Sequence, residues 1–322
     1  MKKIPLPHPH DDIEQVVHLL DDREEWAIKA ALAANRPLLV RGEPGIGKTQ
    51  LAYAAAVHLN RPIIRYTVDS TTEPRDLLWT FDAVQRLAEA QVASQIYRDV
   101  KDAKELEAKL SVKKFIRPGP LWWAIEWATA KTQLGSSERP PAIPKGWKEA
   151  NNVVVLIDEI DKADSDLPNG LLEALGSLQF TPQGWNAPIT ANENSDAPLI
   201  VVTTNEERML PDAFVRRCFV LHIKLPNVLE TRGERDFIAY VKERGAAHFP
   251  QLEVPDLQRA AEVLVEDRKV ALRDKQTQKP GQAEYLDFLR AFAKLKSQGA
   301  DSEELFKNLK EFVFQKSTGM NQ

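Results

Sequence analysis

The sequence predicts an α/β fold with a parallel sheet, followed by a smaller region made only of helices. Apolar runs typical of buried strands, at 153–157, 199–204 and 219–223, are separated by helical patterns, which favours a parallel sheet. A glycine-rich turn at 42–49 joins a strand pattern to a helix pattern. After Pro226 the chain is charged and helix-patterned with almost no strand signal, so we predict domains at 1–225 and 226–322.

The first sixty residues predict a flexible segment followed by a helix, a strand and a second helix. Residues 1–12 are rich in proline and histidine, and we expect them to be flexible. The recurring apolar positions of 13–34 predict a helix. Residues 37–40 then read as a short buried strand, and 50–59, rich in alanine and leucine, as a helix.

The middle of the chain is less regular. Residues 62–68 predict a strand, and 73–95 begin with a helix or loop signal. The alternating charges of 98–114 are typical of a solvated helix, with a basic nucleic-acid patch as the weaker alternative. Residues 121–127 predict a helix whose tryptophans serve the core or a subunit contact.

Composition excludes several classes. The 322 residues carry a net charge of −4, which gives no global attraction to nucleic acid or anionic membrane. The amino terminus has no apolar segment of a signal peptide, and no stretch approaches the roughly 20 apolar residues of a membrane span. Cys218 is the only cysteine, so an intrachain disulfide is impossible. We expect a cytoplasmic protein.

The turn at 42–49 fits G-x-x-x-x-G-K-[ST], the loop that wraps the phosphates of ATP or GTP. Glycines let consecutive backbone N–H groups point at one anion. Lys48 would reach the β- and γ-phosphates, and the Thr49 hydroxyl would ligate Mg²⁺. The predicted nucleotide contacts from this segment are Gly42, Glu43, Pro44, Gly45, Ile46, Gly47, Lys48, Thr49 and Gln50.

Two carboxylates follow the buried strand 153–157. Ligands of open parallel sheets bind at the carboxyl ends of the strands. Asp158 would hold Mg²⁺ directly or through water, and Glu159 would act as the general base on the water that attacks the γ-phosphate. Asn205, at the end of the strand 199–204, could orient that water from the other side.

Two adjacent arginines, Arg216 and Arg217, precede the strand 219–223. A guanidinium can stabilise charge on a transferring phosphoryl group, and such a group is worth about 10³–10⁵ in rate. A single chain cannot easily bring this segment onto its own γ-phosphate. If one of these arginines stabilises the phosphoryl group, we therefore expect it to act on the nucleotide of a neighbouring subunit.

The order of these motifs resembles the AAA+ ATPases and, within them, the MoxR-like branch. The quoted residues are Gly-Glu-Pro-Gly-Ile-Gly-Lys-Thr (42–49), Leu-Ile-Asp-Glu-Ile-Asp-Lys-Ala-Asp (156–164), Thr-Thr-Asn (203–205) and Leu-Pro-Asp-Ala-Phe-Val-Arg-Arg-Cys (210–218). The match covers residues 20–225 well and the helical tail loosely. The resemblance implies a P-loop NTPase fold, a three-layer αβα parallel sheet, followed by an all-helical lid domain.

The resemblance also implies roles and partners. Lys48 and Thr49 are then Walker A, Asp158 and Glu159 Walker B, and Asn205 sensor 1. Arg217 resembles the arginine finger, with Arg216 as the alternative. The family implies ATP and Mg²⁺ as cofactors, a homo-oligomeric, hexameric ring, and a chaperone-like remodelling activity beside a partner with a von Willebrand factor A domain.

One departure from the family pattern concerns sensor 2. The stretch at 279–285, which would begin a lid helix, contains no arginine. Lys279 could substitute, or Arg290 farther along the helix, and an ordinary capped helix start explains Lys279 equally well.

Three other functions remain open at this point. The first is a nucleotide-gated assembly switch, or a signalling or defence regulator, with slow hydrolysis. The second is a nucleic-acid motor, which the net charge and the lack of an aromatic and basic strand platform disfavour. A phosphate-loop kinase is the weakest, because Asn205 and the paired arginines would have no role in it.

Overall fold

The computed structural model describes residues 1–7, 14–96, 110–135, 138–276 and 279–313. The predicted solvated helix at 98–114 lies mostly outside them. The chain divides into two compact units. One comprises Glu25–Arg41 and His58–Leu221, and we call it the sheet unit; the other comprises Met1–Glu24, Gly42–Val57 and His222–Gln322, and we call it the loop-and-helix unit. Within the described ranges, the helices are all too short or too polar to cross a bilayer.

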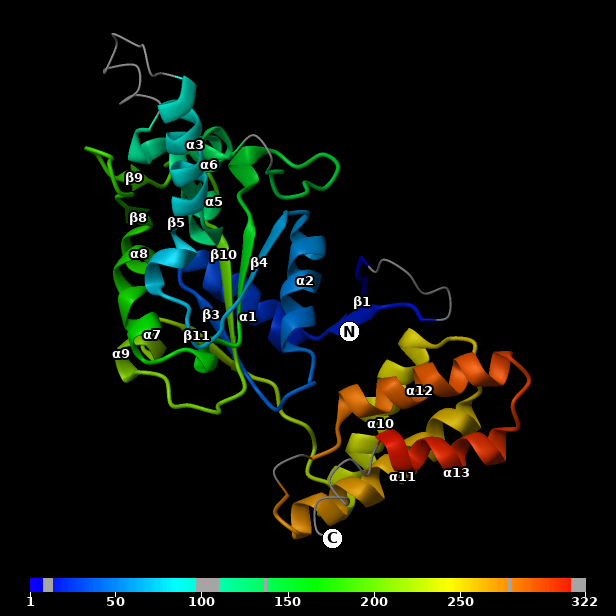
Figure 1. Cartoon of the computed structure of the whole chain (residues 1–322). Helices are drawn as coiled ribbons and strands as arrows, with labels where there is room; N and C mark the ends of the chain where they lie inside the picture. Colours follow the sequence, from blue (N-terminus) through cyan, green and yellow to red (C-terminus); the bar gives the residue numbers. More distant parts are fainter. Residues whose placement is uncertain (8–13, 97–109, 136–137, 277–278, 314–322) are drawn as a thin grey trace. The chain divides into compact units, whose positions relative to one another are not determined.

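The described strands include a five-stranded sheet in the order β11-β3-β10-β7-β4 (Figure 1). Strand β10 is parallel to β3 and to β7, and β4 is parallel to β7. The fold is therefore the predicted P-loop NTPase fold, a parallel sheet with surrounding helices and a carboxyl-terminal helical region. The strands are β3 (Leu38–Arg41), β4 (Ile63–Thr67), β7 (Val154–Asp158), β10 (Leu199–Thr204) and β11 (Phe219–His222).

The register of these strands brings their carboxyl ends to one edge. Val202 of β10 is opposite Ile157 of β7, so Thr203 follows beside Asp158. Thr67 of β4 is opposite Asp158, and Arg41 of β3 is opposite Thr204. Every side chain of β7 is buried, as expected for a central parallel strand.

Helices and 3-10 turns alternate with these strands along the chain. They are α1 (Asp22–Ala33), α2 (Lys48–Leu59), η1 (Pro74–Leu77), α3 (Ala83–Ile96), η2 (Val112–Phe115), α5 (Pro120–Ile125), α6 (Trp127–Gln133), η3 (Glu149–Asn151), η4 (Ile160–Lys162), α7 (Asp166–Gly170), α8 (Leu172–Ser177) and α9 (Asp212–Val215). The predicted helix at 121–127 is broken at Glu126, whose side chain accepts a hydrogen bond from the backbone N–H of Ala128 and caps α6.

The core of the sheet unit contains the tryptophans of α5 and α6. Trp122, Trp123 and Trp127 are all buried, and they pack with Val153, Val155 and other side chains of the sheet. The Trp122 indole N–H donates to the Thr129 hydroxyl, which satisfies its one polar group inside the core. Of the two predicted roles for these side chains, the structure places them in the core.

Three two-stranded antiparallel sheets in the described residues were not predicted. They are β1 (Lys2–Pro5) with β2 (Val17–Leu20), β5 (Trp79–Phe81) with β6 (Ile116–Pro118), and β8 (Gln179–Phe180) with β9 (Ile189–Thr190). The predicted helix 13–34 is therefore wrong for residues 14–21, which contain β2. β1 lies within residues 1–12, and the flexibility of that segment stays a prediction. Residues 8–13 lie outside the described residues.

The carboxyl-terminal region is helical, as predicted from the change after Pro226. Its helices are α10 (Thr231–His248), α11 (Val254–Arg273), α12 (Gln282–Ser297) and α13 (Ser302–Val313), shown from yellow to red in Figure 1. Phe237, Phe288, Phe292 and Phe306 pack in their shared core. The division at residue 226 stays a prediction, because the compact units group Gly42–Val57 with these helices.

Candidate functional site

The glycine-rich segment forms a turn that leads into α2. Gly45 and Gly47 have φ angles of +74° and +100°, values that residues with a side chain rarely adopt. Lys48 is the first residue of α2 and is buried, and its Nζ donates to the carbonyls of Gly42 and Glu43, at 2.7 and 2.9 Å. A glycine loop before a helix amino terminus, with a lysine inside it, is an arrangement that binds phosphate.

The start of α12 lies against this loop, within the same unit. A Cβ added to Gly45 would lie 2.6 Å from the Ala283 Cβ, so only glycine fits there. A Cβ on Gly47 would lie 3.6 Å from Gln282 Nε2. Gln282 is buried, and its Oε1 accepts a hydrogen bond of 2.8 Å from the Tyr240 hydroxyl.

The sequence did not point to Gln282, and Lys279 was instead predicted to replace the sensor 2 arginine of the lid. Lys279 is exposed in the structure, three residues before α12 begins, and its assignment as sensor 2 stays a prediction. The alternative, Arg290, forms ion pairs with Glu14 and Asp287. An uncharged residue at a helix start carries no chemical signal in a sequence, so only the contact with the loop could reveal Gln282.

An arginine of α11 also reaches the loop. Arg268 Nη2 donates to both carboxylate oxygens of Glu43, at 3.0 and 2.7 Å. Sequence reasoning included Glu43 only as part of the loop and did not identify Arg268. A signal existed, because Arg268 continues the spacing of Ala261, Leu264 and Val265 on the buried face of α11, where a charged residue is unusual.

The carboxyl ends of β7 and β10 meet in the sheet unit. The Thr203 hydroxyl donates to Asp158 Oδ1 at 2.7 Å and accepts the backbone N–H of Glu159 at 2.8 Å. Arg65 of β4 donates from Nη2 to Asp158 Oδ2 at 2.8 Å. Asp158 and Thr203 are buried, so this carboxylate has a fixed orientation.

Glu159 follows in a left-handed backbone conformation, with φ 60° and ψ 51°. The Asn205 side-chain amide donates to Glu159 Oε1 at 3.3 Å, so the structure brings these two predicted residues together. Lys162 forms an ion pair with Glu159 Oε2, and this hydrogen bond raises the pKa of Lys162.

The buried carboxylate of Asp161 holds the backbone of Asn205. Asp161 accepts the backbone N–H of Asn205 at 3.2 Å and that of Glu207 at 2.9 Å. It is 2% exposed and fixes the turn after β10, in which Glu206 has a φ of 61°. Sequence reasoning quoted Asp161 within a motif but assigned it no role.

Arg216 and Arg217 follow α9 and are exposed. Arg217 lines a cavity of about 300 Å³ together with Arg36, Leu172, Phe214 and Cys218. Burial raises the pKa of the Cys218 thiol to about 12, so the thiol stays protonated and unreactive at neutral pH. The exposed position of both arginines leaves them accessible to a second molecule.

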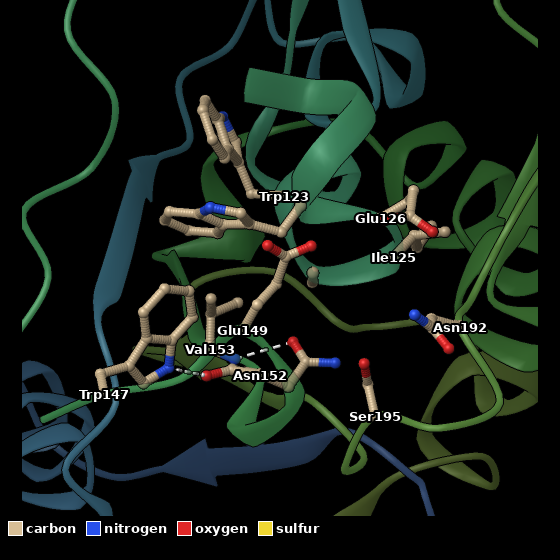
Figure 2. Close-up of a pocket in the computed structure, with 11 residues that line it drawn as sticks. Trp123, Ile125, Glu126, Trp147, Glu149, Asn152, Val153, Asn192 and Ser195 are labelled. Atoms are coloured by element: carbon tan, nitrogen blue, oxygen red, sulfur yellow. Dashed lines mark hydrogen bonds between the residues drawn. The ribbon is translucent and has the colours of Figure 1, made fainter. Parts of the chain in front are cut away.

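A second, much smaller cavity lies beside the tryptophans (Figure 2). Trp147 donates its indole N–H to the Asn152 carbonyl at 2.8 Å, and its ring packs edge to face on Trp127 with centroids 4.7 Å apart. The cavity volume is about 10 Å³, which is the space of one water molecule. This cavity is therefore part of the core packing and cannot hold a nucleotide.

Few side chains of the described residues could serve as metal ligands, which is compatible with Mg²⁺ because this ion needs only one or two protein oxygens. Among the described residues, no group of three or more His, Cys, Asp or Glu side chains could hold a metal ion. Magnesium usually takes one or two protein oxygens and completes its shell with phosphate and water. The buried carboxylate of Asp158 has the oxygen donors that Mg²⁺ prefers, and Thr49 and Asp158 stay the predicted Mg²⁺ ligands.

Comparison with known proteins identifies a family. A family model described as an AAA domain of the dynein-related subfamily matches residues 37–218. A search of curated proteins finds no match. Similar solved structures include a mutant of RuvB from Thermotoga maritima, with 14% identity, 91% of this chain and 68% of that chain covered, and a TM-score of 0.47.

A second similar structure is a putative ATPase from Cytophaga hutchinsonii. Its identity is also 14%, 90% of this chain and 79% of that chain are covered, and the TM-score is 0.37. The family match spans more than half of the chain and contains β3, the glycine-rich turn, β7, β10 and Arg217. The chain belongs to the AAA domain family, in its dynein-related subfamily.

Proposed function

We propose that this protein is an ATP-hydrolysing AAA+ ATPase of the MoxR-like type that acts as an oligomeric, chaperone-like remodeller of a partner protein. The observation that carries the proposal is the paired geometry at the strand ends, where Thr203 orients Asp158 and Asn205 contacts Glu159. The phosphate-binding turn, in a chain of the AAA domain family, supports it.

Each residue has a role in this proposal. Lys48 contacts the β- and γ-phosphates, while Thr49 and Asp158 hold Mg²⁺, which supplies charge neutralisation on the phosphates when bound. Glu159 takes a proton from the attacking water, and Asn205 orients that water. Arg217, or Arg216 in its place, stabilises the transferring phosphoryl group of a neighbouring subunit.

The proposed assembly is a homo-oligomer, a hexameric ring, in the cytoplasm. The exposure of Arg216 and Arg217 supports action on a second copy of the chain. A protein with a von Willebrand factor A domain is the proposed partner.

Concentration dependence tests the proposal. Phosphate release is measured at several protein concentrations with ATP and Mg²⁺, alongside the molar mass in solution. Turnover per subunit is expected to rise as the oligomer forms, and Arg217→Ala is expected to assemble normally but turn over slowly. A monomer whose turnover per subunit does not depend on concentration would contradict the proposal, as would a protein without affinity for ATP.

A slow nucleotide-gated switch is the second candidate. Both strand-end carboxylates are bonded to cations, Asp158 to Arg65 and Glu159 to Lys162, which favours slow hydrolysis. Under this reading Lys162→Met raises turnover, because it frees Glu159 to accept a proton from water. Under the first reading the same variant changes turnover by less than about fivefold, since an exposed ion pair is worth roughly 0.2–1 kcal/mol.

A further inference from the structure

The proposed phosphate-binding turn contains a carboxylate, that of Glu43, which forms an ion pair with the buried guanidinium of Arg268. Glu43 is the second residue of the turn, and its side chain is half-buried. Arg268 Nη2 bonds both of its carboxylate oxygens, and Arg268 Nη1 donates to the Pro280 carbonyl at 2.9 Å. The Arg268 guanidinium also lies 5.5 Å from the centre of the Phe237 ring. Glu43 and Arg268 thus form a defined pair inside one compact unit.

The burial of the two partners is unequal. The Arg268 side chain is 4% exposed, and its Nε is buried without a hydrogen-bond partner among the described residues. A buried guanidinium requires a compensating charge, and Glu43 supplies it. Arg268 therefore cannot leave Glu43 without losing its only charged partner in the described structure.

Glu43 also connects this pair with the phosphate-binding lysine. Its backbone carbonyl accepts from Lys48 Nζ at 2.9 Å, while its side chain accepts from Arg268. Any displacement of Glu43 therefore moves an atom that positions Lys48. The carboxylate is also a negative charge in a turn whose N–H groups would face a polyanion, and an uncompensated carboxylate there repels phosphate.

We propose that Arg268 is a positioning residue for the triphosphate, acting through Glu43. It neutralises the carboxylate in the phosphate-binding turn and anchors the turn to α11. The inference rests on the proposed ATP binding, and it assigns to α11 a contribution to phosphate affinity that acts through Glu43.

The test is ATP affinity in a set of matched variants of the full chain. Arg268→Met is expected to weaken ATP binding by about five- to 150-fold, the usual range of coupling between sites. Binding of ADP is expected to weaken less, because ADP carries less charge. Glu43→Gln/Arg268→Met is expected to bind ATP more tightly than Arg268→Met, because it removes the carboxylate that Arg268 no longer neutralises.

Arg259→Met is the matched control. Arg259 lies on the same helix, forms a bidentate pair with Glu303 and stacks on Phe306, but it is exposed and does not touch the turn. It is expected to bind ATP as the unmodified protein does. Melting temperatures without nucleotide monitor the fold, and if Arg268→Met does not fold, Arg268→Gln replaces it, because glutamine also removes the charge but keeps an amide donor in place of the guanidinium.

The outcomes separate the inference from the proposed function. If the unmodified protein does not bind ATP, the proposed function and the inference fail together. If it binds ATP and the Arg268 variant binds equally well, only the inference fails. A double variant that binds as weakly as Arg268→Met would also overturn it, since the loss would then arise from packing and not from an unneutralised charge.

Discussion

Asn205 donates its side-chain amide to Glu159 Oε1 across 3.3 Å, although the two residues are 46 positions apart in the chain. The contact exists because β7 and β10 are parallel neighbours whose carboxyl ends coincide. Asp161 holds the Asn205 backbone, so the amide points at Glu159 from a fixed turn.

The first prediction concerns Glu159→Gln. The amide keeps the size of the side chain but cannot accept a proton, so ATP should still bind while turnover falls by about 10²–10⁴-fold. Phosphate release and equilibrium binding of ATP measure the two effects separately. Asn205→Ala should lower turnover less, because it only orients the water. Turnover at the unmodified rate in Glu159→Gln would refute the assignment.

The second prediction concerns Thr203→Val, which keeps the shape of the side chain but removes its hydroxyl. Asp158 then loses a buried donor, and the part-buried Glu159 N–H loses its acceptor. Each unsatisfied buried group costs about 1–3 kcal/mol of folding free energy. Activity or Mg²⁺ affinity should fall by about 10–100-fold, as when an outer partner of a metal ligand is lost.

Thr203→Ser is the control for that substitution, because serine keeps the hydroxyl. It should retain most of the stability in chemical denaturation and most of the activity. Equal losses in the serine and valine variants would contradict the assignment, because the serine variant keeps the hydroxyl that makes both hydrogen bonds.

The third prediction concerns Arg65→Met. Arg65 pairs with Asp158, the proposed Mg²⁺ ligand, and would compete with the metal for this carboxylate; the Arg65 side chain is 46% exposed. Removing its charge should lower the Mg²⁺ concentration that gives half-maximal turnover by about two- to fivefold, in line with a screened pair worth up to roughly 1 kcal/mol. Titration of Mg²⁺ at saturating ATP measures this value, and an increase in the requirement would mean that Arg65 supports the metal site.

The central strands of the sheet could be predicted because they are short apolar runs between turn signals. Residues 153–157 are apolar on both faces, as a central parallel strand requires. By contrast, Val17 and Leu20 also fit a helical spacing, and their strand depends on pairing with Lys3 and its neighbours in β1. Pairing between segments is a tertiary effect that local patterns do not contain.

In the candidate site, too, local patterns could be predicted from the sequence, and contacts between distant segments could not. The motifs predicted which residue types follow each strand, because the phosphate turn and the strand-end acids are short local patterns. They could not predict that Arg268 bonds Glu43, 225 positions away, or that Arg65 bonds Asp158. Such pairs depend on how separate helices and strands pack, and a charged residue on an apolar face is the one local sign of them.

The last prediction concerns acid stability and Glu14. Its side chain is 2% exposed, and burial alone would raise its pKa, but hydrogen bonds from His248 and Arg290 lower it to about 2. Since the folded pKa lies below the unfolded value of 4.5, the interaction stabilises the fold fully above pH 4.5 and is lost as the pH falls through 2. The shift corresponds to about 3 kcal/mol at neutral pH.

Glu14→Gln isolates this contribution. The difference in unfolding free energy between the unmodified protein and the variant should be largest near pH 7 and should shrink steadily from pH 4.5 toward pH 2. Chemical denaturation at several pH values measures it, with Glu303→Gln as the control, because Glu303 forms an exposed pair with Arg259. A difference that stays constant down to pH 2 would mean that Glu14 acts through its shape and hydrogen bonding, and that its charge contributes nothing to the docking of Glu14 on His248.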